Sequence, residues 1–167
     1  VQDRITIRSG WIEVEHKSGQ VTHFAAHPGT FPGATQVWHP VRTFDRQGNC
    51  ILYEYSVAGY RSAAGISDSE WILTSIGYTG TTPDNVQCVL DAASRRVKFI
   101  HTLDRPDART SYVGGVASMS VARLAAIVTY VGSQPARRYQ LDYKESVATG
   151  RSLLRNVTLC APQSDDS

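Results

Sequence analysis

Alternation of apolar and polar side chains is the feature that most limits what this chain can fold into. The alternation is clean in RITIR (4–8) and WIEVEH (11–16), and it recurs through most of the chain. Side chains on a β-strand point alternately to opposite faces, so a period of two predicts strands with one buried face. The predicted strands are residues 4–8, 11–16, 21–25, 37–44, 50–57, 71–80, 87–92, 95–103, 122–132, 136–146 and 151–161. The pattern predicts an all-β fold of antiparallel hairpins, arranged as a sandwich or as a curved, shell-like sheet assembly.

The segment RTFDRQGNCILYEY (42–55) shows the expected hairpin chemistry most clearly. Asp45 can accept hydrogen bonds from amides ahead of it, while Gly48 and Asn49 tolerate the positive φ of a tight or bulged turn. Pro40 lacks an amide hydrogen, so its strand is expected to be an edge strand or to be bulged there. Loops are expected at three stretches rich in turn formers, 26–36, 58–70 and 104–115.

The length and charge of the chain limit the class of protein to which it can belong. A length of 167 residues predicts one domain over 1–167, with a flexible tail at 162–167. The chain starts inside an alternating segment, which suggests that it is a fragment of a much larger chain. Its 17 basic and 15 acidic residues are interspersed, so no nucleic-acid partner is expected. The nearest basic cluster, Arg137 and Arg138 with Lys144 and Arg151, is interpreted as a solvated face or a protected edge. No run of about 18 apolar residues is present, so no membrane insertion is expected.

The three cysteines leave two alternatives open. Cys50, Cys88 and Cys160 are odd in number and form no CxxC pair, which argues against a zinc knuckle or a full disulfide framework. They are either free thiols that pack as small hydrophobic groups, or two of them form one disulfide.

The pair Glu13 and Glu15 has the E-x-E spacing used by ADP-ribosyltransferases, where both carboxylates face one cleft. Residues two apart on a strand do share a face. Such enzymes, however, place the pair late in the domain, after an arginine strand and a Ser-Thr-Ser strand, and this chain has no Ser-Thr-Ser. We therefore expect no catalytic residue in this chain, and no cofactor.

Other candidate residues have simpler structural interpretations. His16, His23, His27 and His39 lack the close spacing that preorganises a metal site, so no metal site is expected. Asp104, Asp107 and Asp142 could serve as acids in glycoside chemistry, but they sit in turn contexts where they can cap amides or pair with Arg105 or Arg109.

A glycan-binding face could use Trp11, Trp38, Trp71, Tyr53, Tyr55, Tyr139 and Tyr143, although such aromatic residues more often pack across strands. The NVT sequon at 156–158 is interpreted as strand.

Several segments, taken in order, resemble a known family. They are WHPVRTFDRQGNCILYEY, IGYTG, VKFIHTLDRPDARTSYVGG and RRYQLDYKESVATGRSLLRNVTLCA, which together span about 38–161. They are similar to the SpvB/TcaC N-terminal domain of insecticidal toxin-complex B components and related virulence proteins. FDRQGN and YEY also resemble elements of RHS/YD-repeat proteins. The most specific segments are DYKESVATGRSLLRNVTLCA and then RPD with the following SY.

The resemblance implies a noncatalytic scaffold domain within a large secreted toxin subunit. Its partners would be other domains or subunits of a toxin complex, and it would reach the extracellular space as part of the parent toxin made in the bacterial cytoplasm. A stand-alone β-sandwich binding module, for example for glycans, is the alternative. Any ADP-ribosyltransferase activity would belong to other domains of such proteins.

Overall fold

A computed structural model describes residues 3–27, 37–61, 67–83, 87–103, 105–113 and 116–162. Within these ranges the chain forms twelve β-strands and no helix. The strands are β1 (Arg4–Arg8), β2 (Trp11–Glu15), β3 (Val21–His27), β4 (Val37–Phe44), β5 (Asn49–Arg61), β6 (Ser67–Thr81), β7 (Arg95–Thr102), β8 (Arg109–Val113), β9 (Val116–Ser120), β10 (Arg123–Val131), β11 (Gln134–Glu145) and β12 (Ser152–Cys160). The part of the chain described here holds no helix capable of crossing a membrane.

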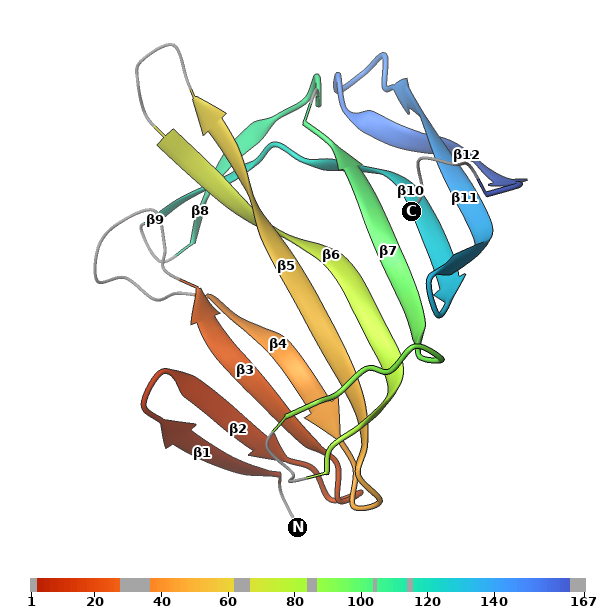
Figure 1. Cartoon of the computed structure of the whole chain (residues 1–167). Helices are drawn as coiled ribbons and strands as arrows, with labels where there is room; N and C mark the ends of the chain where they lie inside the picture. Colours follow the sequence, from red (N-terminus) through yellow and green to blue (C-terminus); the bar gives the residue numbers. More distant parts are fainter. Residues whose placement is uncertain are drawn as a thin grey trace.

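Ten of the described strands form one antiparallel sheet in the order β1-β2-β3-β4-β5-β6-β7-β10-β11-β12. The sheet is strongly curved and does not close on itself, so β1 and β12 are its two edges (Figure 1). The strands β8 and β9 leave this order and pair with each other as a separate ribbon. The all-β prediction is confirmed, and of the two predicted arrangements the structure has the curved sheet.

Three predictions about individual segments are wrong. Residues 87–92, predicted as a strand paired with 95–103, make only an isolated bridge between Val89 and Thr81. The predicted loop 58–70 instead extends β5 to Arg61 and starts β6 at Ser67, because the two strands continue to pair with each other. The predicted loop 104–115 contains β8, and the following strand β9 was not predicted at all. The parts of the predicted loops at 28–36 and 62–66 lie outside the described residues.

Residues 87–94, named the strap here, cross one face of the sheet over β5 and β6. A disulfide joins Cys50 of β5 to Cys88, and paired amide hydrogen bonds link Thr81 with Val89 at 3.0 and 2.8 Å. The Leu90 side chain lies on Gly77 and Gly80, where an added Cβ atom would collide with it. Because these two glycines of β6 have no side chain, they leave room for the strap to pack against the sheet. Of the two alternatives for the cysteines, the structure has one disulfide and a free Cys160.

Local sequence chemistry sets the turns and bulges of the sheet. The Asp45 carboxylate accepts hydrogen bonds from the amides of Gln47 and Asn49, both at 2.9 Å, and Gly48 has a φ of 81°, as predicted for this turn. The register between β3 and β4 shifts beside Pro40, so the strand is bulged there, as one of the two predictions for Pro40 stated. Asn49 is not among the residues with positive φ.

Few of the described side chains are almost fully buried, and one packed cluster lies where the segment that follows β9 meets β5 and β6. Ala58, Val121 and Ala122 are buried together, and Ile72 and Met119 pack against them. Large apolar side chains stay exposed at both sheet edges, including Ile7 at 78% and Leu159 at 61%. The sheet therefore depends on interstrand hydrogen bonds and on a small number of cross-links more than on a thick core.

The disulfide provides the first testable prediction. Cys50 and Cys88 are 38 residues apart, and by the loop-entropy relation cross-linking a segment of this length stabilises a fold by roughly 3–4 kcal/mol. Replacing both residues by serine should lower the free energy of unfolding by about that amount in urea titrations under non-reducing conditions. Cys160→Ser is the matched control and should change it by less than about 0.5 kcal/mol. An unchanged urea midpoint for the double variant would contradict the role given to the strap.

Candidate functional site

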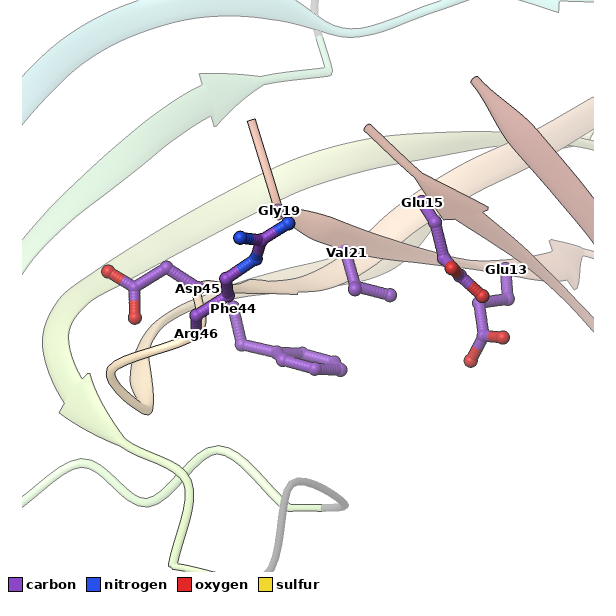
Figure 2. Close-up of a pocket in the computed structure, with 7 residues that line it drawn as sticks. All are labelled: Glu13, Glu15, Gly19, Val21, Phe44, Asp45 and Arg46. Atoms are coloured by element: carbon purple, nitrogen blue, oxygen red, sulfur yellow. The ribbon is translucent and has the colours of Figure 1, made fainter. Parts of the chain in front are cut away.

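The E-x-E pair lies on one face of β2 and lines an open pocket. Glu13 and Glu15 both border a pocket of about 300 Å³, together with Gly19, Val21, Phe44, Asp45 and Arg46 (Figure 2). The prediction that the two glutamates share a face is confirmed. Each is already paired on the same face with an arginine of β1, since Glu15 lies 3.6 Å from Arg4 and Glu13 lies 3.8 Å from Arg8.

The chemistry of this pocket is that of an ion-paired surface. Its lining residues include three carboxylates and one guanidinium. The Phe44 ring and Val21 supply the apolar part of the lining, as Figure 2 shows. Glu13 and Glu15 are already paired with arginines of β1, and the three carboxylates suit the pocket to contact with a polar or cationic group.

Beside the pocket, on the same face of the sheet, a row of bonded polar side chains crosses three neighbouring strands. Glu13, His23 and Arg42 are direct cross-strand partners in β2, β3 and β4. Arg42 Nε donates to His23 Nδ1 at 2.6 Å, and His23 Nε2 lies 3.1 Å from Glu13 Oε2. Because arginine can only donate, Nδ1 must accept, so the imidazole is neutral and Nε2 carries the hydrogen that it donates to Glu13.

His23 is buried within this network, at 4% exposure. The rings of Trp11 and Phe44 lie 4.2 and 5.2 Å from its own ring. Burial lowers the pKa of His23, and the positive charge of Arg42 lowers it further, while Glu13 acts in the opposite direction. The network is thus adapted to a neutral histidine.

The other predicted histidines do not join this one. His16 contacts Asp3 at 3.1 Å, and His39 lies against the ring of Tyr55 at 5.0 Å between centroids. His27 ends β3, and its side chain lies outside the described residues. In the described ranges, no three His, Cys, Asp or Glu residues gather in a way that could hold a metal ion.

Asp107 links two segments that are far apart in sequence. It forms an ion pair with Arg105 at 2.9 Å, and its carboxylate accepts hydrogen bonds from the Ser152 amide at 2.9 Å and the Ser152 hydroxyl at 2.7 Å. Its side chain is only 6% exposed. The hydrogen bonds from Arg105 and Ser152 hold the pKa of Asp107 well below its usual range. These contacts join the RPD segment to the start of β12, the two segments on which the family resemblance depends most.

A second carboxylate holds the β9 end of the ribbon on the sheet. Glu70 in β6 accepts hydrogen bonds from the amides of Val121 and Ala122 at 2.7 and 2.9 Å, and from the Ser120 hydroxyl at 3.3 Å. Arg105 bonds the same segment through Ser120 and the carbonyl of Ala122, both at 3.3 Å. Glu70, Arg105, Asp107 and Ser152 are named the brace here, because together they tie β6, the ribbon and β12 to one another.

The remaining candidates are dispersed. Asp142 is exposed on β11 opposite Asn156, and Asp104 lies outside the described residues. Arg137 and Arg138 are neighbours in β11 and therefore point to opposite faces. The sequon lies in β12 as predicted, where Asn156 donates to Thr158 at 3.0 Å. All the aromatic residues considered for a glycan face are half-buried: Trp11, Trp38, Trp71, Tyr53, Tyr55, Tyr139 and Tyr143.

Sequence reasoning identified part of the brace and missed the rest. Pairing of an aspartate in the 104–115 segment with Arg105 was predicted, and Asp107 confirms it. Glu70 and Ser152 carried no signal, because their partners are 51 and 45 residues away along the chain. The contact between His23 and Arg42 could not be predicted for a similar reason, because it depends on the register between β3 and β4.

Comparison with solved structures identifies toxin proteins with the same fold. The N-terminal domain of the effector protein SpvB from Salmonella typhimurium strain LT2 matches with a TM-score of 0.72 and 15% identity, over 92% of this chain and 61% of that one. A crystal structure of TcdB2-TccC3 matches with a TM-score of 0.68 and 15% identity, over 93% of this chain and 10% of that one. The Tc holotoxin pore of Photorhabdus luminescens, solved with a TccC3 variant, gives a TM-score of 0.67 and 16% identity over 93% of this chain and 9% of that one.

These matches confirm the predicted likeness at the level of fold. The chain spans less than two thirds of the length of each solved neighbour. No family model matches the sequence, and no curated protein matches it either. The chain is thus an all-β domain whose fold occurs in SpvB and in components of Tc toxins.

A pH titration tests the histidine network. The folded pKa of His23 is lowered from 6.5, so as pH falls below about 6.5 the unfolded chain takes up a proton before the folded chain does. The free energy of unfolding should therefore decrease from near pH 6.5 down to the folded pKa, and His23→Gln should reduce that slope. Burial also lowers the pKa values of His39 and His101, so part of the slope should remain. Identical slopes for the variant and the parent chain would refute the assignment.

The brace can be tested through Asp107. Asp107→Asn keeps the shape of the side chain but removes the charge that Arg105 and Ser152 stabilise, so the urea midpoint at neutral pH should fall. Asp142→Asn, at an exposed position of β11, is the control and should leave the midpoint unchanged. Because the pKa of Asp107 is lowered, the difference between Asp107→Asn and the parent chain should shrink as pH falls below about 3.8. A difference that persists at low pH would point to shape instead of charge.

Proposed function

We propose that this chain is a noncatalytic structural domain of a secreted toxin-complex B-like, or SpvB-like, virulence protein. In this proposal it acts as one domain that contributes to the toxin shell or to docking for delivery. The observation that carries the proposal is the match of more than nine tenths of the chain to SpvB and Tc toxin structures. The partners are then other domains or subunits of the same toxin complex.

The character of the surface supports a structural role. The polar clusters are occupied in holding strands together: Glu13 binds His23, Asp107 binds Ser152, and Glu70 binds the start of β10 through backbone amides. Exposed apolar side chains occur at both sheet edges, Ile5 and Ile7 on β1 and Leu154, Val157 and Leu159 on β12, as expected where further protein packs on a sheet. The disulfide is in keeping with an extracellular destination, since such bonds persist in oxidising compartments.

A deletion in the parent toxin tests this role. Removing the region that corresponds to residues 3–162 should abolish assembly or delivery of the toxin, while the isolated toxic domain keeps its activity. The measurements are complex formation on a sizing column and intoxication of target cells, with the isolated toxic domain assayed directly as the control. Delivery that survives the deletion would end the scaffold proposal.

A further inference from the structure

The two edges of the sheet differ in how well they are protected against a further strand. The β1 edge has five residues and carries Arg4 and Arg8 at its ends, with exposed side chains that pair inward with Glu15 and Glu13. Short edge strands with charged side chains resist pairing with another strand, even though Ile5 and Ile7 are exposed there. The β1 edge is thus the protected one.

The β12 edge has the opposite character. It is nine residues long, contains no proline or lysine, and its only charged residue is Arg155. Every described pairing of β12 is with β11, so the outward backbone groups of β12 have no strand partner among the described residues. A long, apolar, unprotected edge is a template for β-strand addition.

The side chains of β12 define what an added strand must look like. Leu159, Val157 and Leu154 lie opposite Tyr139, Leu141 and Tyr143 of β11, which places all six on one face. The register shift beside Tyr143 leaves Arg155 as an extra residue and brings Leu154 onto that face. These three apolar side chains of β12 are 52–61% exposed. The other face carries Asn156, which bonds Thr158, and also Leu153 near the start of the strand.

From this asymmetry we propose that β12 receives an eleventh strand by main-chain pairing. The added strand would be amphipathic, with apolar side chains at alternate positions that extend the row of Leu154, Val157 and Leu159. It would carry polar side chains on the face of Asn156 and Thr158. Pairing would satisfy outward amides of β12 and bury part of its exposed apolar surface.

The occupant is a strand of the larger toxin protein that contains this domain, so the inference rests on the proposed function. The SpvB domain that shares the fold is longer than the matched region, which covers 61% of it, and the Tc toxin chains are about ten times longer. Within this sheet, moreover, most strands pair with the strand that follows them in sequence. Such a protein therefore has both the chain length and the topology to extend the sheet at β12.

Hydrogen–deuterium exchange of the full-length protein and of this chain alone tests the inference. Apart from the amide of Ser152, which donates to Asp107, the amides of 152–160 that point away from β11 should exchange rapidly in this chain alone. In the full-length toxin protein that contains this domain, the same amides should exchange at least about tenfold more slowly, because they are then hydrogen-bonded. Val157→Lys in the full-length protein should restore rapid exchange, because lysine on the apolar face opposes the added strand.

Two controls separate this result from a general loss of structure. Ile7→Lys places the same charge on the β1 edge and should leave the exchange of 152–160 unchanged. Slow exchange of the central strand β5 (Asn49–Arg61) reports that each variant is folded, and Leu159→Arg replaces Val157→Lys if that variant is not.

Two outcomes would overturn the inference. The first is equal exchange of β12 in the two proteins. The second is a dimer of this chain on light scattering that Val157→Lys dissolves, because it would assign the edge to a second copy. If deleting the domain blocks toxin assembly while β12 stays unprotected, only the added strand is refuted. If the deletion leaves assembly intact, the proposed function fails whatever β12 does.

Discussion

An antiparallel sheet that stays open must be stabilised without a continuous second layer. Few apolar side chains of the described chain are almost fully buried: Cys50, Ala58, Val121, Ala122, Ala126, Val128 and Tyr130. Such a small core contributes only part of the free energy that a domain of this size needs. The ladder of main-chain hydrogen bonds across ten strands therefore sets the shape of the molecule, and the other contacts hold that shape.

Two cross-links act at opposite ends of the longest strand pair, β5 and β6. At one end the strap is joined to Cys50 and packs over Gly77 and Gly80. At the other end Glu70, opposite Ala58 in the register, binds the backbone that leads from β9 into β10. One cross-link is covalent and apolar, and the other consists of hydrogen bonds to a carboxylate.

The fold could be predicted largely from periodicity, whereas the contacts that stabilise it could not. Alternation and turn chemistry depend on neighbours in sequence, so most strands and the Asp45 turn were predicted correctly. The alternating pattern of 87–92 predicted a paired strand, but the segment instead packs onto glycines of β6 and makes only one isolated bridge. The brace and the His23 network depend on register across strands, and a single sequence contains no direct record of register.

The excursion of β8 and β9 out of the sheet order affects the route by which the chain folds. Most neighbours in the sheet are joined by short connections, but β7 meets β10 only across a sequence separation of 21, from Thr102 to Arg123. Closing that gap costs more chain entropy than closing a tight hairpin, and pairing β8 with β9 shortens the effective loop. The local hairpins on either side thus form at low cost. The seam between β7 and β10 is the non-local step on which the rate of folding depends.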